Sequence, residues 1–586
     1  MSRPRRAPAI ALVLAIAGLA GCGGGGTATS SSTTTTTGGT SATTTPGATT
    51  TPVATPAPAP ATVGDKLAVG TGCFSYTLTA SPVLTGADPL LAQQWHLRNT
   101  GTNTAAPGAV AGQDLNAFPA WVQTRGEGVR LVVIDDSIEI THPDLRPNLV
   151  EGASKSYRVG NPGGTWPLPC NVNDDNESHG TSVAGLAVAR DGNAIGGSGV
   201  APRASLVAFD ALVNSADADI SEALQRDGAL NAVYHNSWGS PDNAKLNASD
   251  ASFRTAIRQG VDTGRAGKGS IYVFSAGNGQ QSNDNSNYDG YVNVLGTNAV
   301  CAVDQRGRQS SYSEPGANLL VCAPSSGSIS NVATTTLNGG YRTDFSGTSA
   351  SAPMVSGVAA LMLSANPALT WRDVRLILAR TSRQVETADT ATLSNPTAWA
   401  PSALGGTVRF HHKYGYGVVD ANAAVTAAKT WSSVGGSSTL RSCTLDSGTL
   451  TAPIPDATGP TNASTPGTPV TQNLTFSACA ITSIEWVEIR VTIDGGYSGD
   501  FRIDLTRPWN NGGTTVTSTS RLADMRACQK TSVADTNPCG PYSNWLFGSA
   551  RHLGEPGNGT WTLSVTDMNA TDVGTLKNWS ITLYGQ

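Results

Sequence analysis

Apolar and polar residues are arranged in two different ways along this chain of 586 residues, and the change falls near residue 440. Before it, short continuous apolar runs, such as 129–134 and 271–274, are interspersed with small apolar residues suited to buried helices. Strands that alternate with helices predict an α/β domain with a largely parallel sheet. After it, apolar and polar residues alternate, which predicts an antiparallel β-sandwich. The alternating segments are 486–493, 501–505, 561–565 and 579–583.

The first 22 residues have the pattern of an export signal. Arginines at positions 3, 5 and 6 precede an apolar stretch, 9–19, that is too short to cross a membrane as a helix. It runs into Leu19-Ala20-Gly21-Cys22, which resembles a bacterial lipobox and implies cleavage before Cys22 and lipidation of that residue. An ordinary cleaved signal that happens to precede a cysteine is the alternative. Lipidation places the exported protein in the cell envelope, in the outer membrane or at the cell surface, with the lipid on Cys22 as its contact with the membrane.

Composition divides the rest of the chain into a tether and two folded regions. Residues 23–64 are almost wholly Gly, Ser, Thr, Ala and Pro, which have too little apolar surface to offset the entropy lost on ordering. The α/β domain is expected over 65–435, with its core beginning near residue 88, and the β-sandwich over 440–586. The chain carries 37 Lys and Arg against 42 Asp and Glu, a balance that argues against a nucleic-acid-binding protein.

Three polar motifs in the α/β region carry candidate chemistry. Asp135 ends the apolar run 129–134, at the edge where open α/β sheets bind ligands. His179 opens a His-Gly-Thr-Ser sequence and Ser349 lies in Gly-Thr-Ser-Ala-Ser-Ala-Pro, with an Asn motif at 275–279 between them. Each motif alone is weakly informative, because a lone Ser near Gly is usually a turn. In the order Asp, His, Ser, they resemble the subtilisin-like serine proteases (subtilases, peptidase S8).

The resemblance assigns a role to each side chain. A serine hydroxyl is a poor nucleophile until a base removes its proton. Ser349 is expected to be the nucleophile and His179 the general base and then acid. Asp135 is expected to orient His179 and to stabilise its charged form. Asn278 is expected to donate its side-chain amide to the oxyanion, beside the backbone N–H of Ser349.

Several acidic residues resemble the kexin and furin-like branch of that family. Asp242 follows the segment Ser237-Trp238-Gly239, which in the family pairs with the substrate backbone. The branch uses the equivalents of Asp242 and Asp289 to line a primary pocket for Arg or Lys. It uses the equivalents of Asp242, Asp284 and Glu314 to bind calcium. Clustered carboxylates need a cation or raised pKa values, and an oxygen-rich site suits calcium. Solvated loop acids are the alternative.

The same resemblance implies a second calcium site and further contacts to substrate. The loop at 190–197 contributes backbone carbonyls and one Asn side chain in the family. The expected ligands are Asp88, Asp144, Arg190, Asn193, Ile195 and Gly197; a Gly-rich surface turn is the alternative. Asp136 and Glu222 match family positions that contact basic substrate residues. Cleavage after single and after paired basic residues therefore both stay open.

The β-sandwich resembles the P (homo B) domain of proprotein convertases, through 554–561 and the terminal strands. The expected fold is a subtilisin-like, largely parallel sheet flanked by helices, followed by an all-β, jelly-roll-like P domain. In the family this domain stabilises the protease; a carbohydrate- or protein-binding module is the alternative. Between Cys22 and Asp88 there is no room for the folded pro-region of most secreted subtilases. Folding is therefore expected to depend on calcium, on the C-terminal domain or on a separate chaperone.

The chain has nine cysteines, and eight remain once Cys22 is set aside. An even number suits an oxidising compartment, where disulfides persist. The pairing cannot be deduced outright. Proximity favours Cys301–Cys322, Cys443–Cys479 and Cys528–Cys539, which leaves Cys73 with Cys170.

Three functional interpretations remain. The first is a lipid-anchored, calcium-dependent serine endopeptidase that cuts protein or peptide substrates after Arg or Lys. The second is a broad-specificity subtilase whose acidic residues are structural. The third is a non-catalytic surface protein that uses the β-sandwich for binding.

Overall fold

The computed structural model describes residues 85–158, 164–170, 177–327, 330–392, 395–460, 464–528, 530 and 538–586, together with the short strands β1 (Ala68–Val69) and β2 (Tyr76–Thr77). All of these belong to one compact unit, Ala59–Gln586. The expected signal sequence with Cys22, the tether 23–64 and Cys73 lie outside the described residues.

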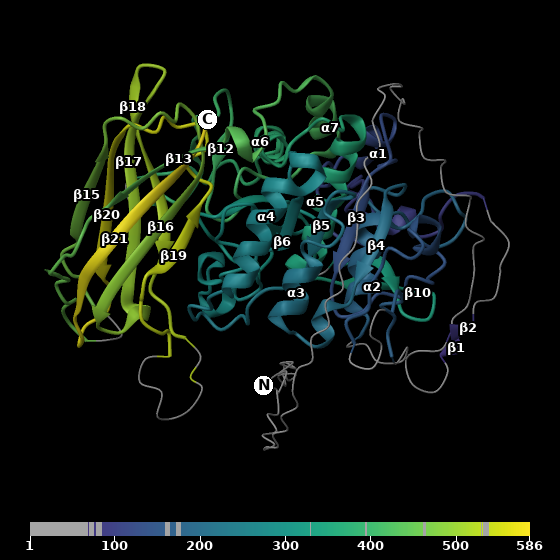
Figure 1. Cartoon of the computed structure of the whole chain (residues 1–586), viewed down its shortest axis with the longest axis horizontal. Coiled ribbons are helices and arrows are strands. Elements are labelled where there is room, and N and C mark those ends of the chain that lie inside the picture. Colours follow the sequence, from purple (N-terminus) through teal and green to yellow (C-terminus); the bar gives the residue numbers. More distant parts are fainter. Residues whose placement is uncertain are drawn as a thin grey trace, which may run out of the picture. The chain divides into compact units, whose positions relative to one another are not determined.

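A six-stranded parallel sheet forms the centre of the first domain, in the order β4-β3-β5-β6-β7-β8 (Figure 1). Its strands are buried on both faces, which explains why their apolar runs are continuous rather than alternating. The strands are β3 (Arg130–Ile134), β4 (Ser205–Phe209), β5 (Asn231–Asn236), β6 (Ile271–Ser275), β7 (Thr297–Val303) and β8 (Leu319–Pro324).

The order of the strands reverses at β3. Strand β4 lies on one side of β3, and β5 pairs with its other side. In open α/β sheets, ligands bind beyond the carboxyl ends of the strands at such a switch point. Asp135, the residue after β3, therefore lies where a binding crevice is expected.

Helices α4 (Ala251–Gly267) and α5 (Thr348–Ala365) cover opposite faces of this sheet. On β6, Tyr272 lies against Gly260 of α4, where it leaves no room for a Cβ atom. On β5, the ring of Tyr234 packs with Tyr272, whereas the next residue, His235, hydrogen-bonds to Ser356 of α5 at 3.1 Å. Neighbouring residues of a strand point to opposite faces, so the two helices lie on different sides.

The remaining described elements of this domain are shorter or lie around the sheet. Among the described helices, only α5 is long and apolar enough to cross a membrane, and 83% of that window is buried inside the fold. A core helix of a globular domain has the same character. The other helices are α1 (Ala117–Trp121), α2 (His179–Val188), α3 (Asp217–Ala223), α6 (Trp371–Thr381) and α7 (Ala421–Thr430), and the other strands are β9 (Val332–Thr336), β10 (Gly340–Phe345), β11 (Ala400–Pro401) and β12 (Arg409–Phe410).

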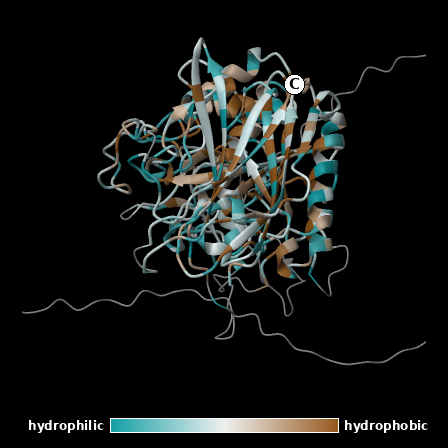
Figure 2. Ribbon diagram, turned by 90° about the vertical axis from the view of Figure 1, so that its left-hand side faces the viewer, coloured by the Kyte–Doolittle hydropathy of each residue, from teal (hydrophilic) through white to brown (hydrophobic). Residues whose placement is uncertain are grey.

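The second domain is a sandwich of two antiparallel sheets, as the alternation predicts. One has the order β13-β21-β16-β19 with β14 also on β21, and the other has the order β15-β20-β17-β18. Apolar and polar residues follow one another along its strands (Figure 2). The apolar ones form its core. The strands are β13 (Arg441–Asp446), β14 (Ala452–Pro453), β15 (Val470–Phe476), β16 (Ile484–Gly495), β17 (Phe501–Asn511), β18 (Thr514–Ala523), β19 (Trp545–Ser549), β20 (Gly559–Asp567) and β21 (Gly574–Gly585).

Buried polar contacts join the sandwich to the α/β domain. Arg372 of α6 and Glu485 of β16 form a two-bond ion pair, at 2.7 and 2.5 Å, with both side chains buried. Asn287 exchanges two hydrogen bonds with the backbone of Gly548, at 2.8 and 3.1 Å. Buried charges that are paired and hydrogen-bonded fix the orientation of two surfaces, because removing one partner is costly.

Three disulfides are present with the predicted pairing: Cys301–Cys322, Cys443–Cys479 and Cys528–Cys539. Cys170 is also disulfide-bonded. Its predicted partner, Cys73, lies outside the described residues, so that pairing stays a prediction.

Candidate active site

The three motif residues of the sequence come from three separate elements of the α/β domain. Asp135 follows β3, His179 is the first residue of α2, and Ser349 is the second residue of α5. The Nδ1 atom of His179 lies 2.8 Å from Oδ1 of Asp135. The side chain of Asp135 is 1% exposed and that of His179 is 35% exposed. A buried carboxylate thus holds one nitrogen of the imidazole, and the ring remains accessible to a reactant.

Gly180 allows this close approach. A Cβ atom at Gly180 would collide with the backbone oxygen of Ser137 and would lie 2.8 Å from Cβ of Asp135. The Gly180 N–H also donates to Oδ1 of Asp136 at 2.9 Å. The glycine after His179 is therefore required by the packing of α2 against the loop that follows β3.

Ser349 lies at the amino end of α5, just after Gly347, whose φ of 82° places it in the left-handed region that glycine tolerates. The Ser349 hydroxyl donates to the carbonyl of Ser237 at 3.2 Å. The Ser237 hydroxyl in turn donates to the carbonyl of Ser349 at 2.9 Å. In this state the Ser349 hydroxyl donates to Ser237, and catalytic hydrogen bonds of free enzymes often tighten only when substrate binds.

Asn278, in the turn after β6, is oriented by the residue that precedes Ser349. The backbone N–H and the hydroxyl of Thr348 both donate to Oδ1 of Asn278, at 2.8 and 3.0 Å. With Oδ1 engaged, the Nδ2 amide is the end of the side chain that is left to donate. Sequence reasoning missed this role of Thr348, although its place beside Ser349 was a signal for it.

The charges around His179 favour its protonated form. Burial opposes the charge on the ring, but the carboxylates of Asp135 and Asp136 outweigh it and raise the pKa of His179 to about 9. Burial and the neighbouring Asp135 charge raise the pKa of Asp136 to about 7. An imidazolium formed by proton transfer from a nucleophile would be stabilised here.

The structure brings four sequence-predicted acids to one pocket, which Tyr288 also lines; they are Asp242, Asp284, Asp289 and Glu314. The pocket lies next to the Asn278 turn, because Oδ1 of Asp242 accepts the backbone N–H of Asn278 at 3.0 Å. Glu314 accepts the N–H of Gly279 at 2.9 Å. The predicted specificity and calcium residues therefore share one hollow beside the site of Ser349.

Backbone donors hold the acids in this pocket. Asp284 accepts from the N–H groups of Ala244 and Asn285, at 2.7 and 2.9 Å. Burial and the charge of Asp242 raise the pKa of Asp284 to about 7. Burial and the charges of Asp284 and Asp242 raise the pKa of Glu314 well above its usual range. The pocket is short of positive charge, as a site for a cation or a basic side chain would be.

Asp289 lines the same pocket. Its carboxylate accepts from the N–H and hydroxyl of Ser240, at 2.9 and 3.0 Å, and from the N–H of Tyr291 at 2.8 Å. Gly239 approaches it so closely that a Cβ atom there would collide with Oδ2 of Asp289. Trp238 donates its indole N–H to the carbonyl of Ile134 at 3.0 Å. The segment from Ser237 to Gly239 thus connects the pocket to the end of β3.

The second predicted calcium loop is also assembled. Asp88 accepts from the N–H groups of Gly192 and Asn193, at 2.9 and 3.0 Å. Asn193 donates its amide to Asp144 at 2.6 Å, and Asp144 also accepts the N–H of Gly197 at 3.3 Å. Burial raises the pKa of Asp144 to about 7 and also raises that of Asp88.

The other two residues of the predicted ligand set lie in the same loop. Arg190 donates its N–H to the carbonyl of Asp144 at 2.8 Å, and Ile195 donates its N–H to Oδ1 of Asn193 at 3.3 Å. Across the ranges that the structure describes, no three His, Cys, Asp or Glu side chains already stand in a metal-binding arrangement. At both places the donors would have to close around a cation.

Glu222 differs from the other predicted substrate-binding acids, because basic side chains of the protein already contact it. Lys155 donates to Oε2 at 2.9 Å, Arg226 donates to Oε1 at 2.8 Å, and the hydroxyl of Tyr157 also donates to it. The carboxylate lies on α3 and is 42% exposed. The charge of Glu222 is therefore largely neutralised within the protein.

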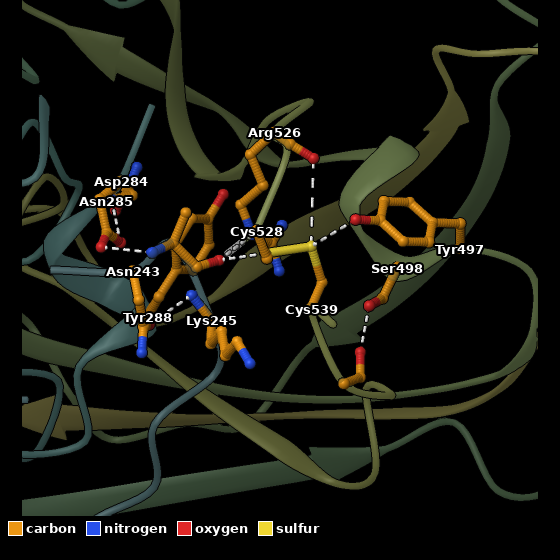
Figure 3. The surroundings of a disulfide bond; sticks show 12 residues. Asn243, Lys245, Asp284, Asn285, Tyr288, Tyr497, Ser498, Arg526, Cys528 and Cys539 are labelled. Atoms are coloured by element: carbon orange, nitrogen blue, oxygen red, sulfur yellow. Dashed lines mark hydrogen bonds between the residues drawn. A yellow bond between two sulfur atoms is a disulfide. The ribbon is translucent and has the colours of Figure 1, made fainter. Parts of the chain in front are cut away.

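The P domain places a cation, Arg526, beside the acidic pocket. Sequence reasoning did not identify this residue. Arg526 donates through Nε to the carbonyl of Ala244 at 2.7 Å and lies 4.0 Å from the ring centre of Tyr288 (Figure 3). Residues 242–244 thus join the pocket to the P domain. Nothing in the local sequence around Arg526 indicates this contact.

Comparisons with known proteins agree with this arrangement. Residues 126–417 match the Subtilase family, and residues 484–583 match the proprotein convertase P-domain. The chain is 31% identical over 533 residues to "Protease KEX1" of Kluyveromyces lactis, in an alignment that covers 90% of this chain and 64% of that protein. It is 33% identical over 512 residues to neuroendocrine convertase 2 of Homo sapiens, covering 85% of this chain and 74% of that protein.

Solved structures show the same architecture. A serine protease of Aeromonas sobria, crystallised as a complex with a chaperone, superposes with a TM-score of 0.72 at 26% identity, covering 86% of this chain and 96% of that one. A structure of the serine protease of Aeromonas sobria superposes with a TM-score of 0.70 at 25% identity, covering 88% of this chain and 100% of that one. The chain belongs to the subtilase family of serine endopeptidases, in its kexin and proprotein convertase branch, and carries the P domain of that branch.

Proposed function

We propose that this chain is a serine endopeptidase that hydrolyses peptide bonds after Arg or Lys. The observation that carries the proposal is the acidic pocket beside Asn278, where four carboxylates meet. A basic substrate side chain in that pocket would be held by opposite charge in a partly desolvated site, which favours Arg and Lys over apolar residues. Asp289 and Asp242 are the carboxylates assigned to it.

The reaction begins when the Ser349 hydroxyl turns from the Ser237 carbonyl to Nε2 of His179. His179 removes the proton as Ser349 Oγ attacks the substrate carbonyl, and Asp135 stabilises the imidazolium. The oxyanion accepts hydrogen bonds from Asn278 Nδ2 and from the Ser349 N–H. His179 then protonates the leaving amine and the C–N bond breaks. A water molecule, deprotonated by His179, hydrolyses the acyl-enzyme and restores Ser349.

Two calcium ions are part of the proposal. Asp242, Asp284 and Glu314 would hold one; their oxygen donors and their unneutralised charge fit a hard divalent cation. The backbone carbonyls of Arg190, Ile195 and Gly197, with Asp88, Asp144 and the Asn193 side chain, would hold the other. Calcium, when bound, supplies the positive charge that these buried carboxylates need. It would hold the pocket wall in shape beside the reacting groups.

We also propose that the protein is exported and anchored through a lipid on Cys22, in the outer membrane or at the cell surface. The lipobox-like sequence before Cys22 supports this. A separate chaperone is the proposed aid to folding. The Aeromonas sobria protease was crystallised as a complex with a chaperone, and it supports that part by similarity. Metabolic labelling with a radioactive fatty acid, compared between the natural chain and Cys22→Ala, tests the anchor.

Hydrolysis of paired fluorogenic peptides, one ending in Arg and one in Phe, tests the enzymatic proposal. Each is measured with the natural chain and with Ser349→Ala, in calcium and in a chelator. The proposal expects Arg-selective cleavage that Ser349→Ala abolishes and that the chelator weakens. Equal cleavage of the Phe peptide would leave a broad-specificity subtilase. Absence of labelling by a serine-reactive fluorophosphonate, in folded and calcium-loaded protein, would contradict catalysis at Ser349.

A further inference from the structure

A second group of acidic residues lies in the loops of the P domain. Asp567 ends β20 and Asp572 lies in the connection to β21. Asp500 precedes β17, and Asp456 follows β14. The N–H of Thr571 donates to both oxygens of Asp456 at 3.3 Å, so these loops meet at one end of the sandwich.

Asp567 is the fully buried member of the group. Its side chain is 0% exposed, and its Oδ1 atom accepts the N–H of Asn569 at 3.1 Å. Its Oδ2 atom is buried and has no hydrogen-bond partner among the residues that the structure describes. A buried carboxylate oxygen without a partner is strongly unfavourable, so this oxygen points to a ligand that the described part of the protein does not supply.

The groups around Asp567 indicate whether that ligand carries a positive or a negative charge. After burial and the Asn569 contact, the largest effects on Asp567 come from the carboxylates of Asp500, Asp456 and Asp572, all of like charge. Burial and this repulsion raise the pKa of Asp567 to about 7 and that of Asp500 to about 6. The charge that would relieve the repulsion is positive.

Two cations of the protein, Arg526 and Lys530, lie near the group. Arg526 lowers the pKa of Asp500, but its guanidinium donates to the carbonyl of Ala244 and to the hydroxyl of Tyr542, at 2.7 and 3.0 Å. Lys530 lines the same cavity as Asp500 and Asp572. Among the described residues, the Asp500 carboxylate accepts a long hydrogen bond from the Asn569 amide, at 3.4 Å.

The group opens to solvent through a cavity of about 520 Å³, which Asp500, Asn569, Asp572 and Tyr497 help to line. A hydrated ion therefore has a route to the buried pair. The oxygen donors of the group are those of the carboxylates, the Asn569 amide and the Tyr497 hydroxyl. Such a set suits calcium better than the transition metals, which prefer nitrogen or sulfur.

We propose that Asp567 and Asp500, with Asp456 and Asp572 at the rim, form a calcium site of the P domain, separate from the two proposed in the protease domain. In the described residues, no three acidic side chains already converge as metal ligands. Binding would therefore draw the half-buried Asp456 and Asp572 inward onto an ion held first by the buried pair. The ion would join the loops that follow β14, precede β17 and connect β20 to β21.

Calcium counting on the full chain tests the site, in a Ser349→Ala background that prevents self-cleavage. Bound calcium per chain is measured by equilibrium dialysis and metal analysis for the background, Asp567→Asn, Asp500→Asn and the control Asp494→Asn. Asp494 lies on β16 of the same domain with its carboxylate 75% exposed. A fourth variant, Asp284→Asn with Glu314→Gln, removes acids of the protease pocket.

The expected result is one calcium fewer per chain in Asp567→Asn and in Asp500→Asn, with Asp494→Asn equal to the background. The protease-pocket variant should lose its own calcium and retain this one, so failure of either proposal is seen separately. In chelator, Asp567→Asn should unfold at the same or a higher temperature than the background, because like charges no longer repel. Its unfolding temperature should also rise less when calcium is added.

Unchanged calcium counts in both single variants would overturn the proposal. A lower unfolding temperature of Asp567→Asn in chelator, with an undiminished rise on adding calcium, would also overturn it, because Asp567 would then be structural. If Asp567→Asn lacks the native circular dichroism spectrum in chelator, the count for Asp500→Asn decides between the two outcomes.

Discussion

Arg526 donates a hydrogen bond of 2.7 Å to the carbonyl of Ala244, whose own N–H donates to Asp284 at 2.7 Å (Figure 3). Ala244 is buried, with a φ of 59° that few residues other than Gly adopt. The Cys528–Cys539 disulfide lies beside Ala244. A buried cation of the P domain therefore acts through one residue on an acid of the protease pocket.

Arg526→Met is expected to destabilise the chain and to loosen this pocket. It leaves the Ala244 carbonyl without its charged donor, a loss of about 1.5–3 kcal/mol. Without this hydrogen bond we expect Ala244 to shift and to move Asp284 with it. KM for an Arg peptide should therefore rise more than kcat falls. Denaturant unfolding and steady-state kinetics measure the two effects.

Arg441→Met is the control for that variant, because Arg441 is an exposed P-domain arginine that donates to the carbonyl of Ala480 at 2.9 Å. It should change neither quantity. Equal kinetics for Arg526→Met and the natural chain would show that the Ala244 contact does not reach the pocket.

The pH profile of catalysis should depend on Asp136. His179 acts as a base only when neutral, so kcat/KM falls as the pH drops through the pKa of His179, which is raised to about 9. The charge of Asp136 contributes to that rise, and with its own pKa of about 7 Asp136 is ionised at alkaline pH. Asp136→Asn should therefore move the acidic limb of kcat/KM to lower pH. A limb that stays in place, or moves upward, would contradict this electrostatic role.

The two predicted substrate-binding acids Asp289 and Glu222 should differ in importance. Asp289 is held by Ser240 and Tyr291 and has its charge available, whereas Glu222 is paired with Lys155 and Arg226. Asp289→Asn should lower kcat/KM for an Arg peptide about 10²-fold, the equivalent of about 3 kcal/mol. Glu222→Gln should cost less than about threefold, as for an exposed ion pair.

Two peptides, with Lys or Ala before the terminal Arg, distinguish the roles of Asp289 and Glu222 further. If Glu222 binds a second basic residue, Glu222→Gln will lower cleavage of the Lys-Arg peptide selectively. A selective loss of kcat/KM for the Lys-Arg peptide as large as that caused by Asp289→Asn would show that substrate displaces Lys155 and Arg226 from the Glu222 carboxylate.

Most of this site could be predicted because its residues lie in contiguous sequence motifs. Asp135, His179 and Ser349 each lie in an extended motif, and α/β topology brings the ends of such motifs to one edge of the sheet. Pairing of Glu222 with Lys155 and the Arg526–Ala244 contact were not predictable in this way. Arg526 and Ala244 are 282 positions apart, and their contact depends on how two domains pack. Side-chain partners across a domain interface leave no periodic or local signal in one sequence.

Gly180→Ala should reduce turnover although it changes no side chain that reacts. The added Cβ would collide with the Ser137 carbonyl and lie 2.8 Å from Cβ of Asp135, so the start of α2 must move and His179 with it. A displacement of about 1 Å at a catalytic group typically costs about 10²-fold. We expect that loss in kcat, with KM little changed, because the acidic pocket does not contact Gly180.

Gly228→Ala is the control, since a Cβ there would lie 3.3 Å from its nearest neighbour, the Gln225 carbonyl. If both variants retain full turnover, the packing after His179 tolerates a side chain, and the geometry of the Asp135–His179 pair is less strictly determined than its 2.8 Å contact indicates.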